Sequence, residues 1–437
     1  MRILHWNALS ERERRAALER PVQQARADIE ALVHEIIAAV RVRGDTALRE
    51  YTRRFDQTEL DALRVSAAEF AAARDALAAH ERTALECAID NVERFHRTHD
   101  LNRVSLETVP GVLCERIYRP IEAVGLYVPA GSAPLPSAVV MLAVPARIAG
   151  CPRRILCTPP DRNGRAHPAV LLAAELCGIE QVFKVGGAQA IAALAYGTES
   201  LPKVDKIFGP GNVWVTAAKQ AVAADPLGAA CDMPAGPSEV MVIADAAADP
   251  QFVAADLLAQ AEHDPSAQAL LVTPSEPLAH TVAAAVQRQV ATLSRQSILE
   301  QSLRASRTLV VEDLETAVAV ANAYAAEHLI LEVREPRALL EHIVNAGSVF
   351  LGAWSPEPMG DYCSGTNHVL PTYGYARAYS GLGVPDYLKR ITVQELTPEG
   401  LRALGPTAVT LARLEGLDAH AAAVTCRLQA LDARVRS

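Results

Sequence analysis

The sequence predicts an α/β protein with two Rossmann-like parallel-sheet domains and small helical segments at the N- and C-termini. From about residue 123 onward, short apolar runs alternate with alanine-rich helical stretches. This is the pattern of parallel strands joined by helical crossovers. Half of the residues are hydrophobic and few are aromatic, a composition typical of a helix-rich α/β protein. At 437 residues the chain is too long for one small core, so we expect two or three domains.

The expected strands fall into two runs that are separated by a break. Pro234 and the Gly236-Pro237 pair interrupt the pattern between 231 and 238. The first run is expected at 123–128, 154–157, 181–185 and 206–208, and the second at 240–244, 269–272, 309–311, 329–333 and 348–351. The G-x-G-x-x-G fingerprint is absent, so the sequence does not indicate a standard Rossmann dinucleotide turn.

The two ends of the chain show helical rather than strand patterns. Ser10-Glu-Arg-Glu13 and Ser66-Ala-Ala-Glu69 are capping-box sequences, which mark the starts of helices. Apolar residues at helical spacing over 23–43 predict a helix that stops at Gly44. The strand signal ends after Gly352, and a helical tail is expected beyond a segment rich in glycine, proline and tyrosine.

Composition excludes several classes of protein. A net charge of −9 leaves no basic stripe for phosphates, which argues against nucleic acid as the main partner. The N-terminus lacks the apolar region of a signal peptide, and no apolar run approaches the roughly 20 residues that span a bilayer. The cysteines form neither a C-x-x-C zinc pattern nor a disulfide framework. We therefore expect a cytoplasmic protein with free thiols.

Three glycine-rich turns follow successive strands of the first run. They are Val128-Pro-Ala-Gly-Ser132, Val185-Gly-Gly-Ala-Gln189 and Phe208-Gly-Pro-Gly-Asn212. Glycines let backbone amides approach a phosphate, and a helix that begins at the turn adds a favourable dipole. A single turn of this kind is usually only a turn. Three at successive strand ends favour a nucleotide or another anionic ligand.

Three polar strings in the last two-fifths of the chain contain candidate metal ligands. Gln260 and His263 lie three residues apart at the end of a helical run, Asp361 lies in a glycine-flanked loop, and His420 lies in the helical tail. Each residue alone is more typical of a helix end, a turn cap or a structural histidine. Together they form an N/O ligand set that suits zinc or a similar divalent ion.

Glu327 and His328 form an adjacent acid–base pair. They lie at an expected helix-to-strand transition, a position that often lines a ligand crevice. Both side chains can transfer protons near neutral pH. A metal site beside such a pair indicates an enzyme.

The chain resembles the histidinol dehydrogenases along nearly its whole length. The matching stretches are 124–129, 185–195, 203–212, 232–239, 360–372 and the strings around the candidate ligands. Gly360-Asp-Tyr-Cys-Ser-Gly-Thr-Asn-His368 is the most specific of them. Two departures are Ala130-Gly131, where the family often has two glycines, and the looser match around Glu415.

The resemblance implies a role for each candidate residue. Zinc, one ion per subunit, is expected on Gln260, His263, Asp361 and His420. These four residues, with Ser238, His328 and Glu415, are expected to bind the substrate. Tyr127, Gln189 and Asn212 are expected to contact NAD.

The reaction implied is the NAD-dependent four-electron oxidation of L-histidinol to L-histidine through bound L-histidinal, at the end of histidine biosynthesis. His328 and Glu327 are expected to act as acid–base groups. The implied domains are a helical segment 1–25, a domain of 26–110 and 239–382 with the metal and acid–base residues, an NAD-binding domain 111–238, and a helical tail 383–437. The tail is expected to be exchanged in a homodimer with shared active sites.

Two other enzyme classes remain open on the residues alone. A thiol-dependent aldehyde dehydrogenase would use Cys114, Cys151 or Cys363 as its nucleophile. A zinc hydrolase would use Glu327 as the base and a water on the metal as the nucleophile. NADH formation from histidinol distinguishes the hydrolase from a dehydrogenase.

Overall fold

The computed structural model describes residues 1–21, 26–99, 101–130, 133–234 and 236–436. The chain forms two compact units, each made from separate segments. The first contains Met1–Thr98 and Ile121–Tyr387, and the second contains His99–Pro120 and Leu388–Ser437.

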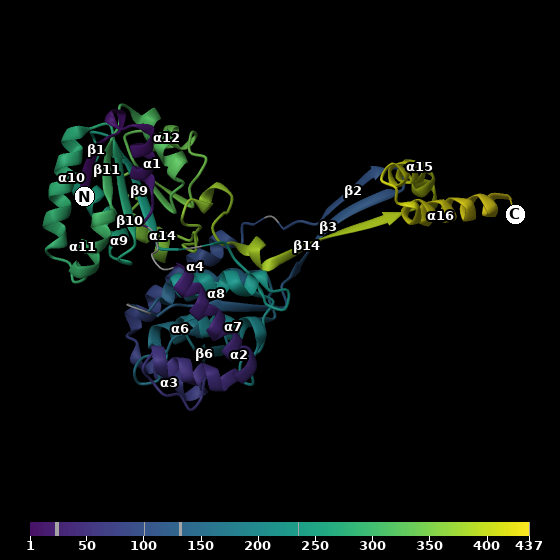
Figure 1. The fold of residues 1–437 in the computed structure, drawn as a ribbon, viewed down its shortest axis with the longest axis horizontal. Helices are drawn as coiled ribbons and strands as arrows, with labels where there is room; N and C mark the ends of the chain where they lie inside the picture. Colours follow the sequence, from purple (N-terminus) through teal and green to yellow (C-terminus); the bar gives the residue numbers. More distant parts are fainter. Residues whose placement is uncertain (22–25, 100, 131–132, 235, 437) are drawn as a thin grey trace. The chain divides into compact units, whose positions relative to one another are not determined.

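A six-stranded parallel sheet organises one half of the first unit (Figure 1). Its order is β1 (Arg2–His5), β11 (Arg307–Val310), β10 (Gln268–Thr273), β9 (Glu239–Ala244), β12 (His328–Glu332) and β13 (Ser348–Leu351). Alternate residues of β9 face opposite sides: Val240 and Val242 pack toward one set of helices, and Met241 and Ile243 toward the other. The first set is α9 (Pro250–Ala261), α10 (Glu276–Val290) and α11 (Gln296–Ala305), and the second includes α1 (Glu11–Leu18) and α12 (Leu314–Tyr324).

The other half of the first unit is a five-stranded parallel sheet. Its order is β6 (Gln181–Lys184), β5 (Arg153–Thr158), β4 (Ala123–Tyr127), β7 (Lys206–Phe208) and β8 (Ala230–Cys231). One face packs on α2 (Arg26–Phe55), α7 (Gly187–Tyr196) and α8 (Val213–Ala224). The other packs on α3 (Ala67–Ala76), α4 (Ala79–His96), α5 (Pro136–Ile148) and α6 (Pro168–Leu176). The central strands are buried on both faces, as in parallel sheets generally.

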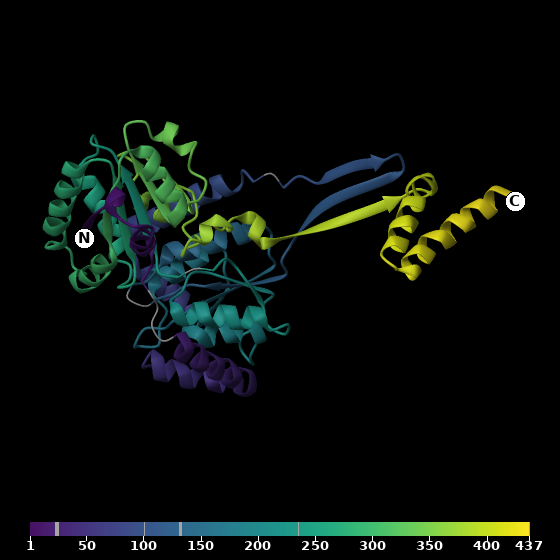
Figure 2. The ribbon, with the colours of Figure 1, turned by 45° about the horizontal axis from the view of Figure 1, so that its top comes forward.

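The second unit is an antiparallel sheet followed by a helical hairpin. Figure 2 shows β14 beside β3, which also pairs with β2. The elements are β2 (Val104–Val109), β3 (Val112–Pro120), β14 (Leu388–Leu396), α15 (Pro398–Leu414) and α16 (Asp418–Arg436). Every residue of β2 except Val109 is exposed, so this small unit leaves apolar side chains uncovered.

The remaining elements are short. They are α13 (Pro336–Leu340), α14 (Glu357–Tyr362) and the 3₁₀ turns η1 (Trp6–Ala8), η2 (Tyr375–Arg377) and η3 (Val384–Tyr387). Within the described ranges, no helix is both long and apolar enough to cross a bilayer.

The structure confirms the fold class, with two parallel sheets that carry helices on both faces. All the strands expected from the alternating pattern are present, with ends shifted by one or two residues. Both capping boxes form, because Ser10 and Ser66 accept hydrogen bonds from the backbone N–H groups of Glu13 and Glu69. The helix expected over 23–43 is present from Arg26, and residues 23–25 lie outside the described residues. It breaks at Gly44, whose φ of 49° is left-handed, and a second helix follows it directly.

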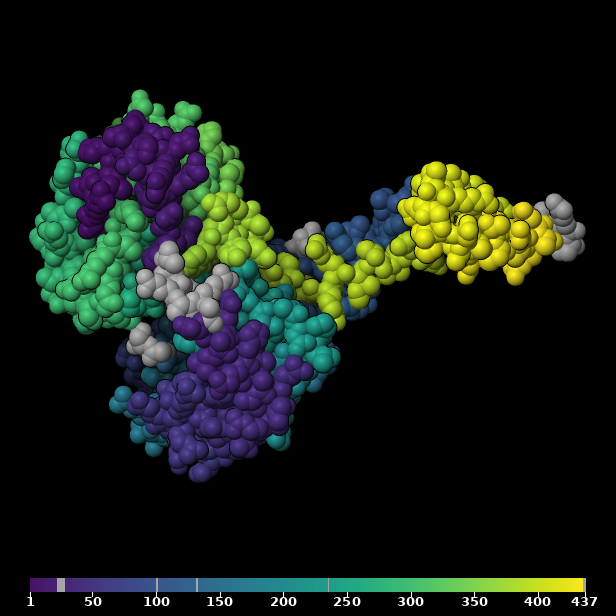
Figure 3. All heavy atoms as spheres, in the orientation of Figure 1, coloured from purple at the N-terminus to yellow at the C-terminus, as the bar shows by residue number. Residues whose placement is uncertain are grey.

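The terminal segments and the expected domain limits differ from the structure. The N-terminal segment was expected to be helical, but β1 adds a parallel strand to the six-stranded sheet. Figure 3 shows this segment (purple) lying over the green part of the half that contains this sheet. The tail was expected to be only helical, but β14 is a nine-residue strand. Helices α2, α3 and α4 pack on the five-stranded sheet, and α4 also contacts the segment 239–382, since Asn91 donates to the Cys363 carbonyl at 2.9 Å. Helical spacing predicts that a face is buried, but not which sheet buries it.

Candidate active site

A cavity of about 1440 Å³ lies within the first unit, and residues from both halves line it. Tyr127, Gln189 and Asn212 line it from the half with the five-stranded sheet, and Ser238 and His263 from the other half. Its volume exceeds the range typical of pockets for drug-sized ligands, so it has room for a dinucleotide together with a small substrate.

The glycine-rich turns lie at the carboxyl ends of β4, β6 and β7. The Gly187 N–H donates to the Tyr127 hydroxyl at 3.0 Å. Gln189 is buried, and its Oε1 has no hydrogen-bond partner among the described residues. Asn212 caps α8, because its Oδ1 accepts the N–H groups of Trp214 and Val215 at 3.1 and 3.2 Å. This leaves the amide N–H groups of Asn212 for a ligand.

Two glycines in these turns are required by close packing. A Cβ at Gly211 would lie 2.3 Å from Val215 Cγ1, and one at Gly209 would lie 2.1 Å from the Tyr127 carbonyl oxygen. Gly209 also has a φ of 126°, which side chains rarely adopt. The third expected turn includes Gly131 and Ser132, which lie outside the described residues.

The metal-ligand candidates of the first unit come from two helix ends. Gln260 belongs to the last turn of α9, and His263 follows it, with its N–H bonded to the Gln260 carbonyl at 3.2 Å. Asp361 lies in α14. Side-chain ligand atoms of His263, Glu357 and Asp361 all lie within 4.8 Å of one another. Gln260 is fully buried beside them, and its Nε2 has no hydrogen-bond partner within the described chain.

The acid–base pair adjoins this cluster. His328 Nδ1 lies 2.9 Å from Gln260 Oε1 and 3.7 Å from Glu327 Oε2, and His328 Nε2 lies 3.5 Å from Asp361 Oδ1. Burial raises the pKa of Glu327 to about 8. Burial acts to lower the pKa of His328, but the carboxylates of Glu327 and Asp361 outweigh it and raise that pKa to about 10. A divalent cation held by Asp361 would lower both pKa values, as a role in accepting protons near neutral pH requires.

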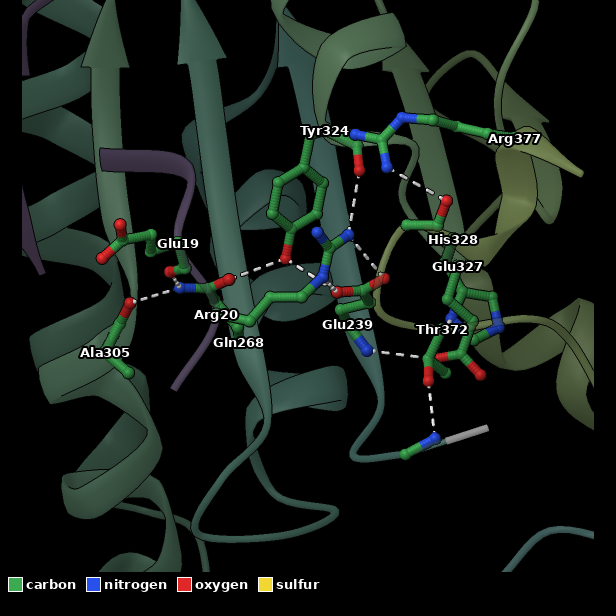
Figure 4. Close-up of polar contacts among 12 residues, drawn as sticks. Glu19, Arg20, Glu239, Gln268, Ala305, Tyr324, Glu327, His328, Thr372 and Arg377 are labelled. Carbon is green, nitrogen blue, oxygen red and sulfur yellow. Dashed lines mark hydrogen bonds and ion pairs between the residues drawn. The ribbon is translucent and has the colours of Figure 1, made fainter. Parts of the chain in front are cut away.

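A buried network of hydrogen bonds holds the Glu327 carboxylate in place (Figure 4). The Glu239 N–H donates to Glu327 Oε2 at 2.9 Å. The Glu239 carboxylate accepts Nε and Nη2 of Arg20 at 2.5 and 2.9 Å, and lies 2.9 Å from the Tyr324 hydroxyl. Arg20 also donates to the Tyr324 carbonyl at 2.9 Å. The N-terminal segment is thereby linked to the acid–base pair.

These residues lie at the amino ends of β9, β10 and β12. Ser238 precedes β9, His263 precedes β10, and Glu327 immediately precedes β12, which begins at His328. Ligands in open α/β sheets usually bind at the carboxyl ends of the strands. The half with the six-stranded sheet departs from this rule, because its site residues lie at the amino ends. The half with the five-stranded sheet follows the rule, because its glycine-rich turns lie at the carboxyl ends.

The structure brings most of the expected site residues together, but not all of them. Ser238 and His263 line the cavity, whereas Gln260, Glu327, His328 and Asp361 are buried next to it. Glu415 and His420 belong to the second unit and are exposed on it. Sequence reasoning missed Glu357, Glu239 and Arg20. A signal existed for Glu357, which lies four residues before Asp361 and so shares its helical face.

The three candidate nucleophilic cysteines have different environments. Cys151 is buried, and its Sγ donates to the Tyr387 carbonyl at 3.6 Å. Cys114 belongs to β3 of the second unit. Cys363 lines the cavity beside Tyr362, so it is the thiol of the three that a substrate in the cavity could contact.

The chain is similar to known proteins over almost its full length. The family model for histidinol dehydrogenase matches residues 18–428. The histidinol dehydrogenase of Vibrio parahaemolyticus is 54% identical over 431 residues, which cover 99% of each chain. That of Yersinia pestis is 52% identical over 430 residues, 98% of this chain and 96% of the other. A crystal structure of histidinol dehydrogenase from Elizabethkingia anophelis matches with a TM-score of 0.95 and 45% identity over 99% of each chain. The chain belongs to the histidinol dehydrogenase family.

Proposed function

We propose that this protein oxidises L-histidinol to L-histidine in two NAD-dependent steps, with L-histidinal retained between them. The observation that carries the proposal is the buried Glu327–His328 pair, which adjoins a cluster of metal-ligating side chains next to a cavity with glycine-rich turns. A metal that orients an amino alcohol, a base for its hydroxyl proton and a hydride acceptor are the parts that this oxidation needs.

The donor set fits a divalent metal ion. Asp361 Oδ1 is buried without a hydrogen-bond partner in the described ranges, the buried Gln260 amide could offer its oxygen, and the nearby ligands are an imidazole and carboxylates. Such N/O ligands suit zinc. We assign Gln260, His263 and Asp361 to the ion, with His420 of the partner subunit as the fourth ligand. Zinc, when bound, would chelate the imidazole and amine of histidinol and so fix the substrate's orientation.

The cavity fits NAD at its other end. Tyr127, Gln189 and Asn212 line it, and the Gln189 Oε1 is buried without a hydrogen-bond partner among the described residues. The helices α7 and α8 begin at the glycine-rich turns, so their N-termini favour a pyrophosphate. NAD, when bound, would accept one hydride in each oxidation.

The chain's own residues supply the proton transfers. His328 would take the proton of the histidinol hydroxyl as the first hydride leaves the carbinol carbon. Glu327 would take a proton from the water that attacks the histidinal carbonyl, and His328 would return its proton to the carbonyl oxygen. The resulting gem-diol would lose a second hydride, to a second NAD, and a hydroxyl proton, to give histidine. The N–H of Glu239 holds the Glu327 carboxylate for this step. Retention of the aldehyde in a buried site protects it from release.

We further propose a homodimer in which the second unit completes the partner's site. Glu415 and His420 are exposed on that unit, as ligands for another chain must be. The unit also exposes apolar side chains, namely Val104, Leu106, Ile391, Leu396, Leu411, Leu414 and Leu417. So many exposed apolar side chains on one small unit favour an interaction surface there.

One experiment tests the activity and distinguishes the other enzyme classes. Purified protein is mixed with L-histidinol and NAD, NADH absorbance is followed, and bound metal is quantified. We expect two NADH per histidinol and stoichiometric zinc. A zinc hydrolase would give no NADH. Loss of turnover in a Cys363→Ser variant would favour the thiol mechanism, whereas we expect that variant to stay active.

Complementation tests the shared site. Inactive His263→Ala chains are co-expressed with inactive His420→Ala chains. Each heterodimer would contain one site with both lesions and one with none, so activity should recover to roughly a quarter of wild type for statistical assortment. If one chain supplies all its own ligands, every site carries a lesion and the mixture stays inactive.

A further inference from the structure

Tyr373 has an unusual backbone conformation for a large side chain. Its φ is 54°, in the left-handed region that bulky residues rarely adopt. A conformation of this kind persists only where the surrounding contacts enforce it, and such residues cluster at functional sites. The contacts around Tyr373 therefore indicate what the strained backbone achieves.

Thr372 and Tyr373 together hold the short segment 236–238. The Gly236 N–H donates to the Thr372 hydroxyl at 2.6 Å, and Thr372 is only 1% exposed (Figure 4). A Cβ at Gly236 would lie 2.2 Å from Tyr373 Cε2, so the ring packs directly on the glycine. Tyr373 also lines a small void of about 10 Å³ together with Ser238. The two residues thus contact the segment from its start to the serine.

The segment leads to Ser238, which lines the large cavity. After Ser238 the chain enters β9, and the Glu239 N–H bonds the Glu327 carboxylate at 2.9 Å. Pro237 precedes the serine and has no N–H to donate, so the Gly236 N–H is the nearest backbone donor before it. The hydrogen bond from this N–H is therefore an anchor on the entry side of Ser238.

We propose that Thr372 and Tyr373 are positioning residues, which hold the segment 236–238 so that Ser238 is placed to bind the substrate. This inference rests on the proposed function, with Ser238 as a residue that binds histidinol. Side chains of consecutive residues in a regular extended chain point to opposite sides. The left-handed turn at Tyr373 lets its ring and the preceding hydroxyl meet the same segment. Their effect passes through Ser238, so it acts on substrate binding rather than on proton transfer.

The test separates substrate binding from folding. Thr372→Val removes the hydroxyl at nearly constant shape, and Thr372→Ser keeps a hydroxyl. The matched control is Thr273→Val, because Thr273 is also buried and its hydroxyl also accepts a backbone N–H, that of Ser275 at 3.0 Å, at the carboxyl end of β10. The values of kcat and of KM for L-histidinol and NAD are measured on purified full-length protein. Urea unfolding and bound zinc are measured on the same samples.

The variants of Thr372 should change substrate binding selectively. Thr372→Val leaves the Gly236 N–H without its acceptor, so we expect KM for histidinol to rise about tenfold while kcat stays within about twofold. KM for NAD and the zinc content should match wild type. Thr372→Ser should restore most of the substrate affinity. Thr273→Val should lose comparable stability but keep the wild-type KM.

Tyr373 is tested through its contact with Gly236. Tyr373→Gly removes the ring, and glycine adopts a φ of 54° without strain, so a rise in KM for histidinol reflects the lost contact. Gly236→Ala should raise this KM in the wild-type background, because its Cβ meets the ring. In the Tyr373→Gly background the same substitution should have no further effect, since residues in contact are not additive.

The outcomes distinguish failure of the inference from failure of the proposed function. A wild-type KM for histidinol in Thr372→Val, or an equal rise in Thr273→Val, would overturn the inference and leave the proposed function intact. If Thr372→Val does not fold, additive effects of Gly236→Ala and Tyr373→Gly on KM would overturn it instead. If wild type forms no NADH from histidinol, the proposed function fails and the inference fails with it.

Discussion

Breaking the ion pair between Arg20 and Glu239 should lower the free energy of unfolding substantially, because it leaves a buried carboxylate without its cationic partner. The Glu239 carboxylate is 2% exposed and receives two hydrogen bonds from Arg20, which also holds the Tyr324 carbonyl. Arg20→Met preserves much of the side chain's length but leaves Glu239 with only the Tyr324 hydroxyl. Removing one partner of a buried pair costs about 3–5 kcal/mol. The Arg20 side chain is 14% exposed, so we expect the lower end, about 3 kcal/mol.

The second substitution separates charge from packing. In Arg20→Met/Glu239→Gln no uncompensated charge remains, so the loss should shrink to about 1 kcal/mol. Stability is measured by urea unfolding followed by circular dichroism, at one protein concentration because association shifts the midpoint. Arg15→Met is the control, since its pair with Glu11 is exposed and should contribute less than about 1 kcal/mol. A single variant as stable as the control, or a double variant as unstable as the single, would refute the reasoning.

Three further predictions concern other parts of the molecule. Burial, and then the charge of Asp256, raise the pKa of Glu332 to about 7, above its value in the unfolded chain. The contribution of this group to stability is therefore present below about pH 4 and is lost as the pH rises through 7. Glu332→Gln should therefore be more stable than wild type at pH 8, with a free energy of unfolding that is higher by about 1–2 kcal/mol after allowance for solvent screening. This gain, measured by urea unfolding, should be smaller at pH 5. Glu327→Gln should slow histidinal oxidation by about 10²–10⁴-fold while one NADH per site still forms in a burst; equal loss of both half-reactions would contradict the assigned roles. Gly211→Ala forces a Cβ against Val215 and should weaken NAD binding by roughly tenfold, about 1.4 kcal/mol, with zinc affinity unchanged; an unchanged NAD dissociation constant by titration would place the nucleotide elsewhere.

Periodicity predicted the buried parallel strands well and the exposed strands poorly. A strand such as β9 is apolar throughout because helices cover both of its faces, and such runs stand out between helical stretches. In β14, Lys389, Arg390 and Glu395 lie among apolar residues, and most side chains of this strand are exposed. A mixed polar strand of this kind resembles the start of a surface helix. β1 is four residues long and lies at a sheet edge, which leaves too little pattern to recognise.

The candidate site was predictable residue by residue but not as an arrangement. Spacing along the chain suggested that Gln260 and His263 share a helix end, and the structure shows this. That His328 contacts both Gln260 and Asp361 depends on sheet order, which no local pattern contains. Arg20 had no signal at all, because an arginine in an exposed-looking N-terminal segment gives no indication that it reaches a buried carboxylate. The assignments of Glu415 and His420 remain predictions from the family resemblance.

The second unit is built from two segments that lie far apart in the sequence, so its sheet can be completed only late in translation. β3 pairs with β14 along its whole length, from Pro120 with Leu388 to Val112 with Leu396, yet most of the chain is translated between these strands. At about 5–20 residues per second, the nascent β2–β3 hairpin would wait for roughly tens of seconds with one edge unpaired. An open strand edge is a template for pairing with other chains. Chains that stop between residues 352 and 387 would contain every strand of both parallel sheets but would keep that edge permanently. Premature termination in this range should therefore yield aggregating fragments that depend on chaperones.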